Sequence, residues 1–426
     1  MKRVLLFFYI VTFIMLAEGC SQSMFTVAGI HADTGGTVTN ALKMNRSKLM
    51  ELPSFDSFSP RLMQVDLRSC DLTSLKLDDK YDVLSHADFD TRTIWPYRLP
   101  EGFDPKLVMK YGKDPGLNIR KLHSYGITGD GVGIAIIGGA ILAEHREYSA
   151  NLKLYDDTRC FDKTATTEGC TAISVAAGIT AGVAPEADVY YIAETPAADS
   201  AGAIADIRGD TGVLDDGELQ AAKYAPLADS IFDIIKINAA IPKEDRIRVI
   251  CINEDIRPAS PEYASVLQAV DNAKREGMFV VSNALYETYN EEMSLNGLGR
   301  NPMKDPGSTA SYGPGLSWAN DFYTFARYSR TKEALLVPMD SRCAAAPTGA
   351  GDYAFYSSGA PCASMGYIAG IYALMCQAKP DLTPEAFWRA ALETGDSVTV
   401  GRNNIDYGLS KIINPLRLYD KIGAPR

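Results

Sequence analysis

Short apolar runs alternate with helical segments between residues 132 and 284, and this alternation limits most strongly what the chain can fold into. Four continuous apolar runs are typical of strands buried on both faces: 132–139, 187–193, 247–253 and 278–284. The segments between them place apolar or small residues at helical spacing: 170–179, 228–241 and 265–277. Strands that alternate with helices predict parallel β-α-β units. We therefore expect an α/β fold with a doubly wound, mostly parallel sheet and helices on both faces.

The pattern continues toward the C-terminus and suggests how the chain divides. Residues 333–339 are predicted to form another strand, and 364–378 a long helix buried on most sides. Thr383-Pro384-Glu385 is typical of a helix start. We expect one domain over residues 105–426. Residues 20–104 are polar and then irregular, which indicates a spacer and an N-terminal extension packed on that domain.

The first twenty residues indicate export. Lys2 and Arg3 precede an apolar run that is too short to cross a bilayer comfortably, and Cys20 follows a glycine. We expect residues 1–19 to be an export signal and Cys20 to carry lipid, which would be the only membrane contact. Glu18 departs from the usual lipoprotein pattern, so simple secretion stays the alternative. The predicted location is the bacterial cell envelope, at the membrane, in the periplasm or on the surface.

Charge and cysteine content exclude some partners and leave others open. The 426-residue chain has a formal net charge of -11, which argues against nucleic acid as a partner because such binding needs a basic face. No Cys-x-x-Cys pair is present, so no zinc-knuckle spacing occurs. Cys160 and Cys170 could be bridged after export, whereas Cys251 and Cys376 lie in apolar runs and are expected to be buried thiols. We expect no cofactor and leave calcium in surface loops open.

Four segments in order resemble the subtilase family of serine peptidases. Residues 126–137 resemble the strand that ends in the catalytic aspartate, and residues 168–192 resemble the histidine helix with its Gly-Val-Ala-Pro turn. Residues 275–284 resemble the strand before the oxyanion asparagine, and residues 353–375 resemble the nucleophile segment. The resemblance implies a subtilisin-like fold and a peptidase cleft. A nucleophile there needs an imidazole to take its proton and a carboxylate to orient that imidazole.

The resemblance places other residues at the triad positions. Gly138 stands at the aspartate position and has no side chain to accept a hydrogen bond. Counting back from the Gly-Val-Ala-Pro turn puts Glu168 at the histidine position, and a slip of one residue would put Gly169 there. A carboxylate is a weak base for a hydroxyl. A glutamate in the first turn is also favoured simply by the helix dipole.

The nucleophile and oxyanion positions depend on the register chosen. Counting back from the helix gives Cys362 as the nucleophile, whereas counting forward from Ser358-Gly359 gives Pro361. A cysteine at a helix start can be reactive, but it needs a base. Asn283 is the candidate oxyanion side chain, although it could equally cap a turn, and strict spacing points to Tyr286.

Two further stretches bear on catalysis and binding. His145 lies in a turn that resembles a structural turn of the family after the aspartate, with catalysis as the less favoured alternative. The stretch that resembles the substrate-groove strand ends in Asn253-Glu254-Asp255, whose carboxylates would change or block strand addition by a peptide.

Three functions follow from these residues. The first is a catalytically inactive member of the family that binds a peptide or protein in a vestigial cleft. The second is an active hydrolase with atypical chemistry based on Cys362, helped by Glu168 or His145. The third is a lipid-anchored envelope binding protein with a generic α/β core. Convergence of Gly138, Glu168 and Cys362 in space would favour the first two over the third.

Overall fold

A computed structural model describes most of the chain. The described residues are 39–45, 47–59, 61–195, 216–254 (the backbone alone for 216–223), 256, 263–324 and 334–423. The predicted export signal, Cys20 and the beginning of the predicted spacer lie outside the described residues.

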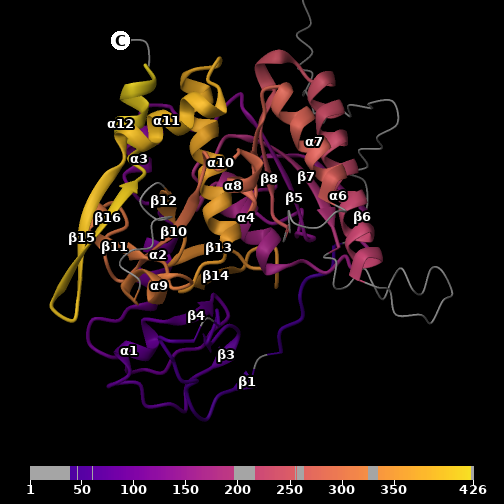
Figure 1. Cartoon of the computed structure of the whole chain (residues 1–426). Coiled ribbons are helices and arrows are strands. Elements are labelled where there is room, and N and C mark those ends of the chain that lie inside the picture. The colour runs from indigo at the N-terminus through magenta and orange to yellow at the C-terminus, as the bar shows by residue number, and fades with distance from the viewer. Residues whose placement is uncertain are drawn as a thin grey trace, which may run out of the picture.

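The centre of the molecule is a five-stranded, fully parallel sheet (Figure 1). Its strand order is β6-β7-β5-β8-β9, so the chain leaves β5 first toward one edge and then toward the other. The bounds are β5 Gly133–Gly138, β6 Leu152–Arg159, β7 Asp188–Glu194, β8 Ile247–Ile252 and β9 Phe279–Val281. This arrangement confirms the predicted α/β fold with a doubly wound sheet.

Helices cover both faces of this sheet because alternate strand residues point to opposite sides. Ile134 and Ile136 of β5 join one apolar cluster, and Ala135 and Ile137 join the other. The second cluster is covered by α6 and α7, which lie to the right of the sheet in Figure 1. Their bounds are Asp216–Ala240 and Ala264–Arg275. The helices expected at 228–241 and 265–277 are thus confirmed, with an earlier start for α6.

The opposite face is covered by α4 (Thr167–Ala177) and α10 (Pro361–Ala378), which pack closely on each other. The contact depends on glycines. A Cβ atom at Gly366 would lie 2.7 Å from the Ala172 carbonyl oxygen, and one at Gly370 would lie 2.6 Å from the Val183 Cβ. This close approach buries α10 on nearly all sides, as its apolar sequence predicts. Shorter helices complete this face: α3 Ile119–Ser124, α8 Leu285–Thr288, α11 Pro384–Thr394 and α12 Pro415–Ile422.

A second, mixed sheet extends the core beyond β9. Its order is β11-β10-β12-β16-β15, and α9 (Ala319–Thr324) packs beside it. The strands are β10 Leu295–Arg300, β11 Tyr312–Pro314, β12 Leu335–Pro338, β15 Asp396–Arg402 and β16 Ile405–Ile412. The predicted strand at 333–339 is β12. Positive φ angles at Asn403 and Asn404 make the tight turn of the β15–β16 hairpin.

The N-terminal extension contributes strands to the rest of the molecule. Strand β4 (Ala87–Asp90) pairs with β14 (Tyr353–Tyr356) in a sheet of order β13-β14-β4-β2. Figure 1 shows this extension, in indigo, below the main sheet. Phe355 belongs to the apolar core of the extension. The remaining elements here are β1 Ser47–Lys48, β2 Val65–Asp66, β3 Cys70–Asp71, α1 Tyr81–Leu84, α2 Pro105–Lys113 and β13 Arg342–Ala345.

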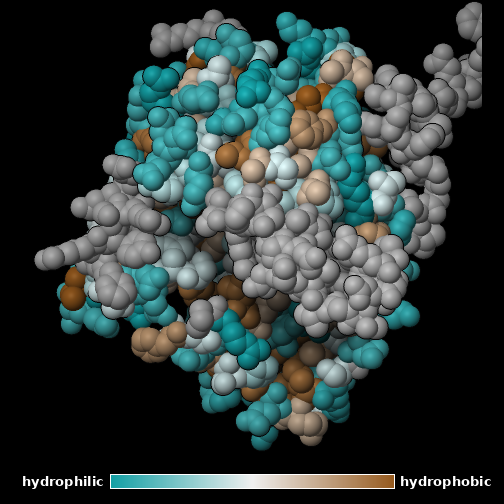
Figure 2. All heavy atoms as spheres, turned by 45° about the vertical axis from the view of Figure 1, so that its right-hand side comes forward, coloured by the Kyte–Doolittle hydropathy of each residue, from teal (hydrophilic) through white to brown (hydrophobic). Residues whose placement is uncertain are grey.

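The surface side chains and the cysteines of the described residues can be compared with the sequence-based expectations. Figure 2 shows mostly hydrophilic side chains on the visible face, with scattered apolar ones. No helix in the described ranges is long and apolar enough to cross a membrane. Cys160 and Cys170 are free thiols, so the bridge considered between them is absent: the Cys170 thiol lies 3.7 Å from the Tyr148 hydroxyl, and Cys160 donates to the Asp162 carbonyl. Cys251 and Cys376 are buried, as expected.

Candidate functional site

The candidate site lies at the carboxyl ends of β5 and β8, where the strand order changes direction. In open α/β sheets this switch point is the usual place for a ligand. Gly138 ends β5, and Asn253 follows β8 directly. The amino-terminal end of α4 reaches the same place, because a Cβ atom at Gly169 would lie 2.5 Å from the Gly139 carbonyl oxygen. The structure therefore brings the aspartate and histidine positions of the resemblance together.

A side chain at Gly139 or at Gly169 would require the surrounding atoms to shift. A Cβ atom at Gly139 would lie 2.6 Å from the Thr166 hydroxyl oxygen, which itself caps α4 by accepting from the Gly169 amide at 3.1 Å. A Cβ atom at Gly138 would lie 3.1 Å from the Asn253 Cβ. The Asn253 side chain therefore covers Gly138, and its Nδ2 is buried with no hydrogen-bond partner among the described residues.

Tyr191 fills the space beneath these backbones. It lies on β7, on the face of the sheet that α4 and α10 cover, and it is 0% exposed. Its hydroxyl donates to the Gly139 carbonyl at 2.6 Å, and a Cβ at Gly169 would lie 2.7 Å from that hydroxyl. Burial raises the pKa of Tyr191 well above its usual value, so the phenol stays neutral. No sequence motif marks Tyr191, although the alternation of side chains along β7 places it on this face.

Cys362 occupies the second position of α10 and faces the core. It is 3% exposed and belongs to the same apolar cluster as Cys251 of β8. Burial raises the pKa of the Cys362 thiol, and the nearby Glu168 carboxylate and Cys251 raise it further. A helix start normally lowers a thiol pKa, but burial outweighs that effect here. Pro361, which the alternative register places at the nucleophile position, begins the helix and has no nucleophilic atom.

Glu168 and Asn283 lie at the surface. Glu168 is exposed in the first turn of α4, close enough to Cys362 for its charge to act on the thiol. Asn283 follows β9, and its side-chain amide forms hydrogen bonds with the backbone of Ile256. Its Oδ1 accepts from the Ile256 amide at 3.2 Å, while its Nδ2 donates to the Ile256 carbonyl at 3.3 Å. These bonds join Asn283 to the segment after β8, 27 positions earlier in the chain, and the oxyanion and turn-cap roles stay predictions.

The described histidines make other contacts. His145 is fully buried: its Nε2 lies 2.8 Å from the Asp352 carbonyl, and its Nδ1 accepts from the Glu147 amide at 3.0 Å. His123 lies 2.8 Å from the Val183 carbonyl. Burial lowers the pKa of both rings. Within the described ranges, no histidine forms a hydrogen bond with Cys362, so the thiol has no imidazole base there.

Glu147 is the most heavily hydrogen-bonded carboxylate near this region. It is 0% exposed and accepts from the amides of Thr180 and Ala181 at 2.9 and 2.7 Å. It also accepts from the hydroxyls of Thr180 and Tyr353 at 2.6 and 2.7 Å. The carboxylate thereby joins the turn after β5, the loop after α4 and strand β14. Its role is structural, because four donors occupy its oxygens.

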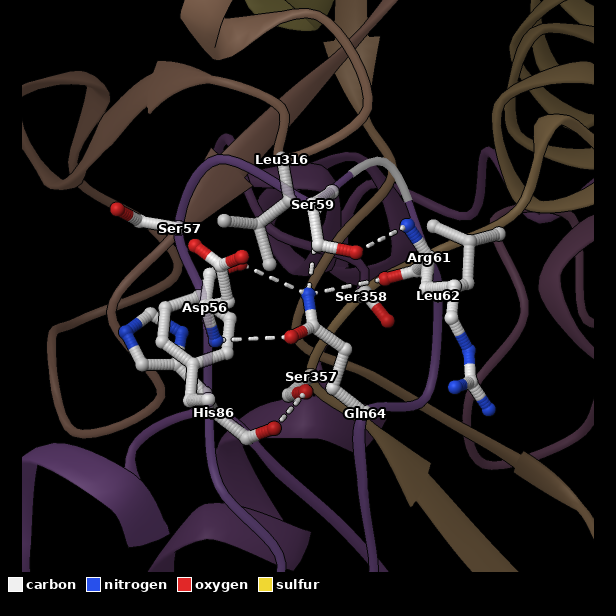
Figure 3. A pocket seen from close by; sticks show the side chains of 11 residues that line it. Asp56, Ser57, Ser59, Arg61, Leu62, Gln64, His86, Leu316, Ser357 and Ser358 are labelled. Atoms are coloured by element: carbon white, nitrogen blue, oxygen red, sulfur yellow. Dashed lines mark hydrogen bonds between the residues drawn. The ribbon is translucent and has the colours of Figure 1, made fainter.

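A small pocket lies between the extension and the loop before α10 (Figure 3). It holds about 20 Å³, which is room for roughly one water molecule. Although His86, Asp56 and Ser357 line it, they do not form a triad. The His86 ring stacks on Phe55 with centroids 3.7 Å apart, while the Ser357 hydroxyl donates to the His86 carbonyl. The Gln64 amide closes the loop beside them through bonds with the Asp56 backbone.

Comparisons with known proteins give a distant likeness among solved structures. No family model matches the chain, and no curated protein matches it. Among solved structures, the prenylagaramide maturation protease PagA is similar over 72% of this chain and 98% of that chain, with 14% sequence identity and a TM-score of 0.45.

Proposed function

We propose that this chain is a subtilisin-like protein of the cell envelope that has no peptidase chemistry and binds an extended peptide or protein segment. One observation carries the proposal: the residue at the nucleophile position, Cys362, is a buried thiol without an imidazole partner, and Tyr191 fills the space beneath Gly139 and Gly169. Lipid at Cys20 and calcium in surface loops stay predictions.

The chemistry supports inactivity. A thiol attacks as its thiolate, and burial in the apolar cluster holds Cys362 in the neutral form. Glu168 is the acidic group whose charge acts on it, and a carboxylate disfavours the thiolate instead of promoting it. Gly138 offers no charge to orient a base. Peptidase activity would therefore need a nucleophile, a base and an orienting acid other than the residues at these three positions.

The position of the site supports binding, because open α/β sheets have a crevice outside the carboxyl ends of the strands at the switch point. The buried Asn253 amide there has a donor that no described residue accepts. An unpaired buried amide costs free energy that a ligand carbonyl could recover. A peptide presents such carbonyls at regular spacing, which makes an extended segment the ligand that fits this donor.

A cleavage assay tests the inactive half of this proposal. The mature protein is incubated with casein beside the Cys362→Ala variant, and new peptides are counted by mass spectrometry. We expect neither sample to exceed the buffer blank. Cleavage by the wild type that Cys362→Ala abolishes would establish the alternative, an active hydrolase based on this thiol.

A binding assay tests the other half. Anisotropy of fluorescent casein peptides is measured with wild type, Asn253→Ala and a control, Asn272→Ala. Asn272 lies near the end of α7, at the opposite end of the sheet from Asn253. We expect Asn253→Ala to weaken binding about tenfold, which corresponds to one lost hydrogen bond of about 1.4 kcal/mol. Equal binding by all three proteins would contradict a peptide site at Asn253.

A further inference from the structure

Two buried carboxyl groups hold the short loop of residues 357–359, which joins β14 to α10. Asp88 comes from strand β4 of the extension, and Asp340 follows β12 of the second sheet. They bind opposite ends of the loop, at Ser357 and at Gly359. The loop is therefore the junction between the extension and the helix that carries Cys362.

Asp88 binds the first residue of the loop. It is 0% exposed, and its Oδ1 accepts from the Ser357 amide at 2.6 Å. The Ser357 hydroxyl, which donates to the His86 carbonyl at 2.7 Å, lies 3.2 Å from the same Oδ1. The Asp88 Oδ2 is buried, and no described residue forms a hydrogen bond with it. The charged groups that act on it are Asp66 and Arg68, which pair with each other at 2.8 Å. Arg68 thus does not neutralise Asp88 directly.

Asp340 binds the last residue of the loop. It is 2% exposed, and its Oδ1 accepts from the Gly359 amide at 2.7 Å while its Oδ2 accepts from the Leu316 amide at 2.8 Å. Among the ion pairs of the described residues, none involves Asp340. The nearby guanidinium of Arg300 donates to backbone carbonyls, including that of Ser341 at 3.1 Å.

Both carboxyl groups therefore carry their charge into the interior with only neutral donors for compensation. Burial raises the pKa of Asp88 to about 7 and that of Asp340 to about 7, and the hydrogen bonds they accept offset only part of this effect. Because an aspartate released into water has its ordinary pKa of 3.8, ionisation favours any state in which the junction opens.

We propose that Asp88 and Asp340 form a pH-sensitive clasp on the loop before α10: when protonated, Asp88 holds the N-terminal extension against the loop and Asp340 holds the second sheet against it, and the clasp loosens when they are ionised. Protonation removes the buried charge but leaves oxygens that can still accept from the loop amides. Stability from this clasp is fully present below the ordinary pKa and is lost as the pH rises through neutrality. The clasp does not depend on whether the crevice binds or catalyses.

The expected size follows from the two pKa values. For one carboxyl group with a pKa of about 7 when buried and 3.8 when released, opening becomes about tenfold more favourable between pH 6 and pH 8. Asn at either position mimics the neutral carboxyl group, so Asp88→Asn and Asp340→Asn should each remove their own share of this dependence.

Hydrogen exchange of the mature protein tests the clasp. Protection factors, corrected for intrinsic exchange, are measured by mass spectrometry at pH 6 and pH 8 for peptides that cover residues 354–362. Wild type should lose at least about tenfold protection over this range. The double variant Asp88→Asn/Asp340→Asn should keep equal protection at both pH values. Ser358→Ala is the matched control, because it removes an acceptor of the Met63 amide from the same loop without removing a titrating group.

The outcomes of the exchange experiment separate the clasp from other causes of pH dependence. Ser358→Ala should show lower protection than wild type at both pH values, with the same tenfold loss between them. Equal wild-type protection at pH 6 and pH 8 would overturn the clasp. So would a tenfold loss that persists in the double variant. Should that variant not fold, the single variants Asp88→Asn and Asp340→Asn are measured instead, and a wild-type loss that neither of them reduces would overturn the clasp.

Discussion

Two neighbouring regions at the carboxyl end of the sheet differ in how fully their polar side chains are hydrogen-bonded. In the turn after β5, His145 and Glu147 are fully buried and use nearly every hydrogen-bonding atom they have. In the crevice beside it, the positions where an acid, a base and a nucleophile would be expected hold Gly138, the exposed Glu168 and the buried Cys362.

The difference shows that chemistry depends on where an imidazole and a carboxylate lie, not on their presence in the chain. The pair at His145 and Glu147 joins three segments of backbone and does not face the thiol. Buried polar networks of this kind stabilise a structure only when every member is satisfied. We therefore expect substitutions in the network to affect folding and substitutions in the crevice to affect it little.

Loss of the Glu147 carboxylate should have the largest effect. Glu147→Ala leaves four donors without an acceptor, so we expect it to lower the free energy of unfolding by about 4 kcal/mol or to prevent folding. Urea denaturation measures the change. Glu168→Ala is the matched control and should stay within about 0.5 kcal/mol of wild type. Equal effects at the two glutamates would remove the distinction between the regions.

His145→Phe should have an intermediate effect. Phenylalanine fills about the same space as the imidazole ring, but the Asp352 carbonyl and the Glu147 amide both lose their hydrogen-bond partner. We expect a loss of about 2 kcal/mol in the free energy of unfolding, from the same denaturation experiment. If His145 instead acted as a base, the variant would keep its stability and lose an activity.

Asn283→Ala should have the smallest effect of the three. It removes two hydrogen bonds of an exposed side chain to the backbone of Ile256, so we expect about 1 kcal/mol. An oxyanion role would appear differently, as unchanged stability with a lower cleavage rate. Thermal unfolding monitored by circular dichroism is sufficient to separate the two.

The buried strands and helices could be predicted well because their signal is local. Strands β5, β7, β8 and β9 are continuous apolar runs, and α10 is apolar on all sides. Strand β6 was missed because it is an edge strand, and its sequence LKLYDDTR mixes polar with apolar residues. The β15–β16 hairpin was missed for a similar reason, since exposed residues alternate with half-buried ones along β15 and most of β16 lies outside the core.

Long-range contacts could not be predicted in the same way. Asp88 and Ser357 are 269 positions apart, and the sequence of neither segment predicts that the two residues form a hydrogen bond. For the site, the sequence could place Gly138, Glu168 and Cys362 at the three positions, because motif order carries that information. It could not show that Tyr191 fills the space beneath Gly139 and Gly169 or that the Cys362 thiol faces the core, since both depend on packing.

Alkylation of Cys362 tests the central claim most directly. The mature protein is treated with iodoacetamide at pH 6, and modification of the peptide that contains Cys362 is followed over time by mass spectrometry, with the urea-unfolded protein as reference. We predict that the native thiol reacts at least about a hundredfold more slowly than the unfolded one, because it is buried and its pKa is raised. A native thiol that reacts faster than the unfolded one would be an activated nucleophile, and it would contradict the account of this chain as an inactive scaffold.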